Sequence, residues 1–231
     1  NDGTCIYAPT GYDCSGACLA DSDGDGVCDG DEMVGCTDAS AYNYNALATD
    51  DDGTCTYPLD LIITEIADPN NDVSGRFIEI FNPNSSTVNL DSYELQRWTN
   101  GNTSPSTSSN IDLMGNIASG EYHVVARDSV DFTGIYGTIC NQNGGTGGPA
   151  DSNGDDQIAL LFDGQIMDMF GVAGEDGSGT AHEFEDGRAR RKCSVTSANA
   201  VWDENEWDID NDSGGGDGPQ DAPADFDPFN N

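Results

Sequence analysis

Positive charge is scarce in this chain of 231 residues. Lys and Arg together number 7, against 43 Asp and Glu, and the formal net charge at pH 7 is -36. A protein that binds a phosphate backbone needs a cationic surface, and this chain has few groups to build one. We therefore expect an acidic protein whose partners are not nucleic acids.

Long hydrophobic runs are also missing. The longest apolar stretches, residues 61–63 and 158–162, have the length of strands, whereas a membrane-spanning helix needs about 20 apolar residues. The sequence therefore predicts no transmembrane segment. Because it begins at Asn1 and shows no signal peptide, we expect a processed or truncated product.

Histidine occurs only twice, as His123 and His182. Acidic residues follow His182, so a role as general acid or metal ligand is conceivable there. However, no second histidine, nucleophile motif or phosphate-binding glycine loop accompanies it. The sequence therefore favours a protein without catalytic activity.

Aliphatic residues are sparse in residues 1–58, which also contain no Lys or Arg. So short and polar a segment cannot form an ordinary core and needs disulfides or metal ions. Its even number of cysteines, without a zinc-type CxxC pair, favours disulfides and hence an extracellular protein. The six cysteines are Cys5, Cys14, Cys18, Cys28, Cys36 and Cys55.

Residues 21–32 follow the spacing D-x-D-x-D-G-x5-E, which is typical of a calcium-binding loop. Ca²⁺ prefers about six to eight oxygen ligands, and alternating carboxylates around a tight glycine turn supply them. The segment lacks flanking amphipathic helices, so it resembles the calcium repeats of thrombospondin type 3 and favours a structural ion over an EF-hand switch. A solvated acidic loop is the alternative. The expected ligands are Asp21, Asp23, Asp25 and Glu32, the carbonyl of Val27, and Asp29 or a water molecule.

An internal repeat is present: DGTCIY at residues 2–7 returns as DGTCTY at 52–57. The intervening GCTD and NYN motifs, at 35–38 and 43–45, resemble repeat units of large secreted bacterial surface proteins. This resemblance implies that residues 1–58 are a spacer and that further copies exist upstream. We expect a disulfide between Cys36 and Cys55, whose loop is worth about 3 kcal/mol, and leave the other pairings open.

From residue 59 onward, short alternating runs are separated by Gly, Asn, Ser and Pro turns, with no amphipathic helix. This pattern predicts an all-β, immunoglobulin-like sandwich over residues 59–211, although the periodicity also fits a barrel. The side chains of Tyr122, Val124 and Ala126 should share one face. The predicted strands are 61–66, 76–81, 93–98, 121–127, 157–162, 165–170 and 188–195.

Several of these segments, taken in order, resemble the bacterial lamin tail domain over about residues 60–210. They are LIITEI at 61–66, FIEIFNP at 77–83, VNLDSYEL at 88–95, DDQIALL at 155–161 and MDMFGV at 167–172. The resemblance implies an immunoglobulin-like fold without catalytic residues. It also implies a binding or structural module of the kind appended to secreted nucleases, other hydrolases and surface proteins.

Four of the seven basic residues lie close together, at Arg188, Arg190, Arg191 and Lys192. On a strand, three of them would share one face and could bind an acidic partner or a glycan. The alternative, which we prefer, is that they neutralise acidic groups of the same chain, such as those of residues 183–186.

Two features remain in the C-terminal half. Residues 212–231 are rich in Gly, Asp and Pro and predict a linker or tail, in which Phe226 and Phe229 could dock. Cys140 and Cys193 are the only cysteines beyond residue 58, and we expect them to form a disulfide.

Together these features predict a non-catalytic extracellular module of a bacterial surface adhesin, stalk or fibre, stabilised by Ca²⁺ and disulfides. Its expected partners are neighbouring repeats or copies of the same protein, including a homopolymer in which a neighbour's acidic segment meets the basic cluster. A monomeric bead on a longer polypeptide is the competing arrangement. The alternative function is an accessory binding domain of a secreted nuclease or other hydrolase.

Overall fold

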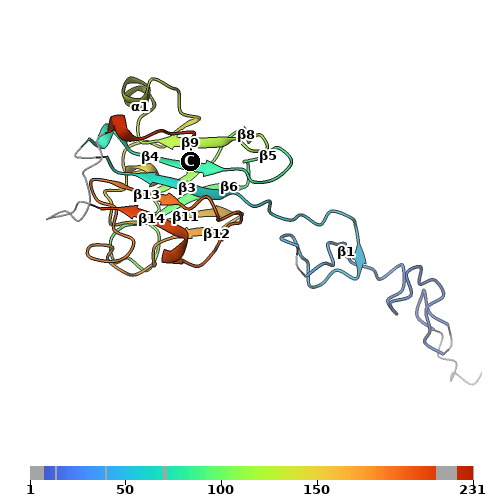
Figure 1. Ribbon diagram of the computed structural model, residues 1–231. Helices are drawn as coiled ribbons and strands as arrows, with labels where there is room; N and C mark the ends of the chain where they lie inside the picture. The colour runs from blue at the N-terminus through green and yellow to red at the C-terminus, as the bar shows by residue number, and fades with distance from the viewer. Residues whose placement is uncertain (1–7, 14, 40, 70–71, 212–222, 231) are drawn as a thin grey trace, which may run out of the picture. The chain divides into compact units, whose positions relative to one another are not determined.

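The chain divides into two units, Asn1–Pro58 and Leu59–Asn231. The computed structural model describes residues 8–13, 15–39, 41–69, 72–211 and 223–230 (Figure 1). Cys5, Cys14 and residues 212–222 of the predicted tail lie outside the described residues.

Disulfides take the place of a hydrophobic core in the first unit. Cys18 is bonded to Cys28 and Cys36 to Cys55, with Cα–Cα distances of 5.3 and 4.9 Å. Among the described residues of this unit, only Cys28, Cys36 and Ala41 are buried. The bridge between Cys36 and Cys55 is the one that the sequence predicts, and two of the three buried residues belong to the bridges themselves.

Backbone pairing in the first unit is sparse. Within its described part, the named strands are β1 (Val34–Gly35) and β2 (Asp50–Asp51), which pair in parallel. Carboxylates close many of the turns; for example, Asp13 accepts hydrogen bonds from the backbone nitrogens of Ser15 and Ala17 at 2.8 and 2.9 Å. Local polar contacts and disulfides therefore hold this unit.

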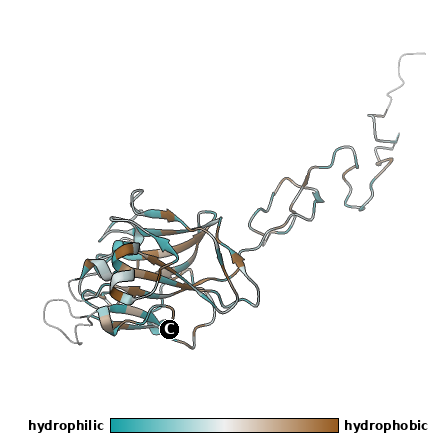
Figure 2. Ribbon diagram, turned by 90° about the horizontal axis from the view of Figure 1, so that it is seen from above, coloured by the Kyte–Doolittle hydropathy of each residue, from teal (hydrophilic) through white to brown (hydrophobic). Residues whose placement is uncertain are grey.

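The second unit is a β-sandwich. One sheet has the order β10-β9-β4-β3-β13-β14 and the other the order β12-β11-β6-β7, while β5 pairs with β8. Side chains of both sheets, such as Ile78 and Leu160, meet in one fully buried core. Figure 2 shows hydrophobic segments on these strands. The all-β, immunoglobulin-like fold is therefore confirmed.

The strands of the sandwich are mostly short. Their bounds are β3 (Ile62–Ala67), β4 (Phe77–Phe81), β5 (Val88–Asn89), β6 (Tyr93–Trp98), β7 (Asn110–Asp112), β8 (Asn116–Ile117), β9 (Tyr122–Ala126), β10 (Gln142–Asn143), β11 (Gln157–Phe162), β12 (Gln165–Phe170), β13 (Arg188–Arg191) and β14 (Trp207–Asp210). Three predicted strands agree at both ends, whereas the last predicted strand ends four residues early. There a turn closes as the nitrogen of Val195 donates to the carbonyl of Lys192.

One helix lies in this domain, for which the sequence predicts no amphipathic helix. Helix α1 (Ser129–Tyr136) begins after Asp128, whose carboxylate accepts from the nitrogens of Val130 and Asp131, and ends at Gly137 with φ of 69°. These are ordinary cap residues. The sequence pattern does not reveal this helix because only Phe132 of it is fully buried, so no amphipathic stripe marks it. Short 3-10 helices occur at Val73–Gly75, Pro149–Asp151, Glu204–Glu206 and Pro223–Asp225.

A second hydrophobic cluster lies on the outer face of the six-stranded sheet. Phe77 of β4 and the predicted one-face pair Val124 and Ala126 of β9 belong to it. Helix α1 contributes Phe132, and the C-terminal segment contributes Phe226. The end of the chain therefore packs on its own sandwich.

The predicted disulfide between Cys140 and Cys193 is wrong, because both cysteines are free. Cys140 directly precedes the residues that pair with β9, whereas Cys193 follows β13. Two strands lie between β9 and β13 in the sheet order. Three strand spacings amount to about 14 Å, well beyond the span of a disulfide.

Phe170 should be a main source of stability in the sandwich. It is fully buried and makes edge contacts with four aromatic rings, including those of Trp202 and Trp207. We expect Phe170→Ala to lower the free energy of unfolding by about 3–5 kcal/mol in chemical denaturation. Val172→Ala, at a position 44% exposed, is the control and should change it by less than about 0.5 kcal/mol. Equal effects would contradict this account of the core.

The two free cysteines should react differently with iodoacetamide. Cys193 is exposed and should be alkylated in the folded protein. Cys140 is buried, and burial raises the pKa of its thiol, so it should react only after unfolding. Mass spectrometry of non-reduced peptides measures the alkylation of both cysteines. A peptide pair linked through Cys140 and Cys193 would contradict the structure.

Candidate functional site

The acidic loop brings three of its predicted ligands together. Carboxylate oxygens of Asp21, Asp23 and Asp25 lie within 4.8 Å of one another. Among the described residues, this is the one group of at least three His, Cys, Asp or Glu side chains that meets this distance. Asp23 and Asp25 are exposed and Asp21 is half-buried, so the group faces solvent.

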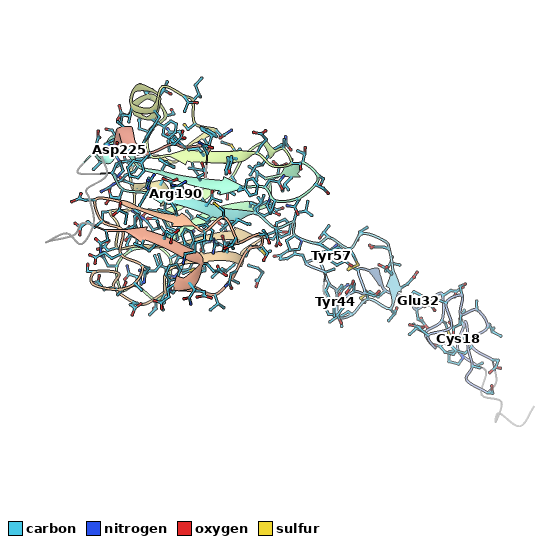
Figure 3. All side chains as sticks on the ribbon, viewed as in Figure 1. Cys18, Glu32, Tyr44, Tyr57, Arg190 and Asp225 are labelled. Carbon is cyan, nitrogen blue, oxygen red and sulfur yellow. A yellow bond between two sulfur atoms is a disulfide. The ribbon has the colours of Figure 1, made fainter. Side chains whose placement is uncertain are left out.

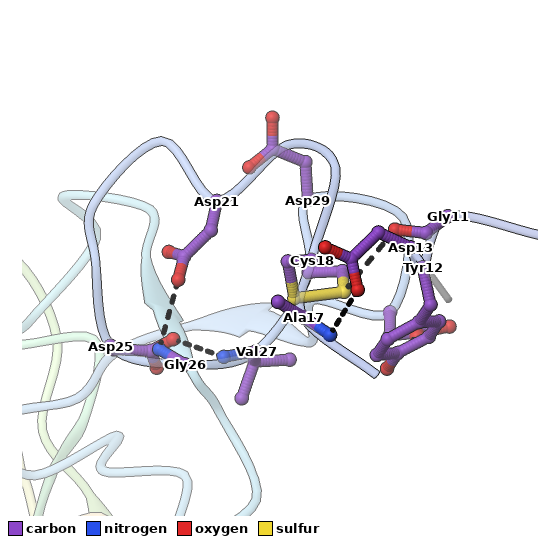
Figure 4. The surroundings of a disulfide bond; sticks show 12 residues. Gly11, Tyr12, Asp13, Ala17, Cys18, Asp21, Asp25, Gly26, Val27 and Asp29 are labelled. Carbon is purple, nitrogen blue, oxygen red and sulfur yellow. Dashed lines mark hydrogen bonds between the residues drawn. A yellow bond between two sulfur atoms is a disulfide. The ribbon is translucent and has the colours of Figure 1, made fainter. Parts of the chain in front are cut away.

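The backbone of the loop folds around these carboxylates. Asp21 accepts a hydrogen bond from the nitrogen of Gly24 at 2.7 Å. It also accepts one from the nitrogen of Gly26 at 3.2 Å (Figure 4). Gly26 has φ of 97°, a conformation that suits glycine, at the sixth position where the motif requires a sharp turn. The disulfide between Cys18 and Cys28 joins a residue before the three carboxylates to a residue after them, and so closes the loop covalently.

The later predicted ligands have other partners. Asp29 accepts from the nitrogen and hydroxyl of Ser22 at 2.7 and 2.8 Å, and its carboxylate points away from Asp21 (Figure 4). The carboxylate of Glu32 accepts a hydrogen bond from the hydroxyl of Thr49. The nitrogen of Val27 donates to Asp25 at 2.7 Å. The structure thus gathers the first three carboxylates but not Asp29 or Glu32.

The basic strand β13 presents two arginines to the outer face of its sheet. Arg188 and Arg190 both approach the carboxylate of Glu65 on β3, at 3.5 and 3.6 Å. The guanidinium of Arg188 also lies 4.7 Å from the ring centre of Phe226. Arg190 is labelled in Figure 3. These two residues share a face, as alternation along a strand predicts.

The other two members of the cluster have different surroundings. Arg191 is buried, forms an ion pair with Asp168, and lies 2.5 Å from a carboxylate oxygen of Glu206. Lys192 lies 3.8 Å from Asp208. The chain's own carboxylates therefore neutralise the cluster, which is the alternative preferred from the sequence.

The three remaining basic residues are paired as well. Arg76 and Arg127 both bind the carboxylate of Asp151, at 3.2 and 2.6 Å, and Arg97 binds Asp156 at 3.0 Å. All seven Lys and Arg side chains of the sequence thus form ion pairs within the second unit. The net charge of -36 is consequently carried by carboxylates that have no basic side chain left to balance them.

A buried pair of glutamates was missed in the sequence. Glu65 of β3 and Glu79 of β4 are opposite each other in the sheet and are 1% and 0% exposed. Glu79 accepts from the hydroxyl of Thr64 at 2.7 Å and from the nitrogen of Phe229 at 2.5 Å. Burial raises the pKa of both carboxyl groups, that of Glu65 to about 7. The sequence feature that could have predicted their burial is that each glutamate lies inside a hydrophobic run, LIITEI or FIEIFNP.

Both histidines are buried and hydrogen-bonded to polar side chains. His182 contacts Thr180 at 3.0 Å and Gln157 at 3.3 Å, and His123 contacts Gln142 at 3.4 Å. Burial lowers the pKa of each imidazole. They lie in the sandwich as packed side chains.

The helices of the described part of the chain are too short and too polar to cross a membrane. The remaining features define a class: an immunoglobulin-like β-sandwich joined to a disulfide-bonded, acidic segment.

The chain belongs to the Lamin Tail Domain family, whose pattern matches residues 56–174, just over half of the sequence. This family is a non-catalytic, immunoglobulin-like interaction module. A search of curated proteins finds no match to the chain. Strands β13 and β14 complete the six-stranded sheet but lie beyond the matched residues, so the match ends earlier than the expected limit near residue 210.

The raised pKa of Glu65 predicts a pH dependence of stability. Arg188 and Arg190 of β13, Glu79 of β4 and Tyr136 of α1 are the charged or titratable groups that interact with it. Because the folded state binds this proton more tightly than the unfolded state, stability should fall as the pH rises from about 4.5 to 7. The contribution is about 3 kcal/mol at 1.36 kcal/mol per pKa unit.

Glu65→Gln should remove this contribution. Urea titrations give the free energy of unfolding of parent and variant at each pH. The value for the parent minus the value for the variant should fall as the pH rises over the same range. Glu121→Gln, at an exposed position, is the matched control and should show no such trend. A difference between parent and Glu65→Gln that does not change with pH would contradict the assignment.

Proposed function

We propose that this chain is a non-catalytic extracellular interaction module of a bacterial surface protein such as an adhesin, stalk or fibre. Residues 1–58 act as a spacer, and the lamin tail domain carries the interaction surface. The observation that supports this most directly is the pair of disulfides in a unit with only three buried described residues. Such bridges persist in oxidising compartments and replace the core in small secreted domains.

The charge distribution supports the same proposal. Since every basic side chain is paired inside the sandwich, unbalanced carboxylates dominate the chain. A net charge so far from zero keeps molecules soluble and separates copies by repulsion. Contacts with a partner then depend on apolar groups, backbone groups or bridging cations.

Ca²⁺ is the proposed structural ion of the spacer, as in the thrombospondin type 3-like repeats that the loop resembles. Asp21, Asp23 and Asp25 fit a hard divalent cation because their oxygens already lie within 4.8 Å of one another. The carbonyl of Val27, together with Asp29 and Glu32, supplies the further ligands proposed from the spacing. A bound cation would offset the mutual repulsion of the carboxylates and order the loop.

Calcium binding can be measured by titration calorimetry on the full chain. We expect uptake with a dissociation constant of about 10⁻⁴ to 10⁻³ M, the range of extracellular modules. The triple variant Asp21→Asn, Asp23→Asn and Asp25→Asn removes three negative charges with little change in shape, and should weaken binding by about 100-fold or more. Ca²⁺ should also protect residues 15–36 from proteolysis in the parent only.

The matched control removes the same charge from the second unit. Asp91→Asn, Glu121→Gln and Asp131→Asn alter three exposed carboxylates and should leave calcium uptake unchanged. A parent that takes up no Ca²⁺ at millimolar ion, or a loop variant that binds as well as the control, would exclude calcium from this function.

A further inference from the structure

The C-terminal segment, residues 223–230, lies against the outer face of the six-stranded sheet. Phe226 is 6% exposed, and its ring meets that of Phe77 edge-on, with centroids 6.5 Å apart. Phe132 and Tyr136 of α1 also contact Phe77, so α1 and the segment cover the same part of β4. Figure 3 labels Asp225 in this segment.

Polar groups of the sheet contact the segment at two points. The guanidinium of Arg188 lies 4.7 Å from the ring centre of Phe226, and Glu79 accepts the backbone N–H of Phe229 at 2.5 Å. The surface beneath the segment, which we call the groove, is formed by Phe77, Glu79, Phe132, Tyr136 and Arg188. Beside the segment an open pocket remains, lined by Ile135, Tyr136, Thr138 and Ile139 and by residues of the segment itself, Pro223, Phe226, Pro228 and Phe229. The sheet thus offers an aromatic surface, a cation and a carboxylate that accepts a backbone N–H, as peptide-binding surfaces do.

The conformation of the segment also depends on this surface. Phe229 has φ of 74°, in the left-handed region that a bulky L-residue rarely adopts. Its N–H is held by Glu79 in that conformation. Such a backbone persists where the surroundings impose it, so the groove selects the shape of the segment.

The connection to this segment is much longer than it needs to be. Strand β14 ends at Asp210, whose partner in the sheet is Arg188, and Arg188 in turn contacts Phe226. The chain therefore leaves and returns beside the same residue, with residues 211–225 between. Fifteen residues can span about 50 Å when extended, so the segment could reach the groove of another molecule.

We propose that this groove is a peptide-binding site whose ligand is the C-terminal segment of a second copy of this chain. The inference deepens the proposed interaction module and rests on it. When copies are dilute, the segment of the same molecule fills the groove, because its flexible tether gives an effective concentration of about millimolar. When copies are crowded, as on a surface, the segments exchange and link one sandwich to the next.

The first test uses a fluorescent peptide with the sequence of residues 221–231. The double variant Phe226→Ala and Phe229→Ala, in the full chain, empties its own groove. We expect this variant to bind the peptide saturably, and the parent to bind it at least about tenfold more weakly because its own segment competes. The same peptide with both Phe replaced by Ala is the control and should not bind. Absence of peptide binding to the folded variant would overturn the proposal.

The double variant removes Phe226 from a hydrophobic cluster, so its folding must be verified by circular dichroism and tryptophan fluorescence. Phe229→Ala alone retains Phe226 and removes a half-buried ring, and it provides a second variant with an intact cluster. It should admit the peptide more readily than the parent does. Peptide binding equal to that of the parent would count against the groove.

The second test measures association by sedimentation equilibrium from about 10 μM to 1 mM. The parent should be monomeric at the low end and form dimers or longer species near 1 mM, whereas both Phe variants should form fewer. A parent that stays monomeric, or association that does not depend on Phe226 and Phe229, would overturn exchange between copies. Calcium titration of the same samples is independent of the groove, so failure here and failure of the proposed calcium-stabilised module are distinguishable.

Discussion

A buried carboxylate, Asp168, connects the two sheets of the sandwich. It lies on β12, pairs with the guanidinium of Arg191 on β13, and accepts the N–H of Ile63 on β3 at 2.8 Å. A charge removed from water is tolerated only when its hydrogen-bonding sites are filled, and those of Asp168 are filled by Arg191 and Ile63 of the opposite sheet and by the backbone N–H of Asn199. Because Arg191 points inward to this pair, alternation along β13 turns Arg188 and Arg190 to the outer face. The groove for the C-terminal segment therefore depends on the ion pair beneath it.

The two units are stabilised internally in two different ways. The first unit has too few apolar side chains for a core, so covalent bridges restrict its unfolded states and polar side chains close its turns. The second unit has a core filled from both sheets. It also tolerates buried ionisable groups such as Glu65, because basic side chains such as Arg188 lie beside them.

The scarcity of basic residues shapes the outer face of the six-stranded sheet. All seven form ion pairs within the sandwich, several of them at buried sites where the basic group compensates a desolvated carboxylate. The cluster at residues 188–192 is consequently part of the architecture, and Arg188 meets the segment through an aromatic ring as well as through charge. The contacts between this face and residues 223–230 combine hydrophobic burial with a few directed polar contacts.

The sequence by itself determined the features that depend on local pattern. Period-two alternation located the strands Tyr93–Trp98 and Gln157–Phe162, and spacing identified the carboxylates at 21, 23 and 25. The repeat unit and the entropy of its loop pointed to the bridge from Cys36 to Cys55. Helix α1 was not predicted because its cap residues, rather than an apolar stripe, define it. Only the tertiary structure decided the rest: that Cys140 and Cys193 stay apart, that Glu65 faces Glu79, and that Phe226 packs beside Arg188. Each of these depends on which strands become neighbours, and residues as distant as Ile63 and Arg191, 128 positions apart, meet only when the whole sheet has formed.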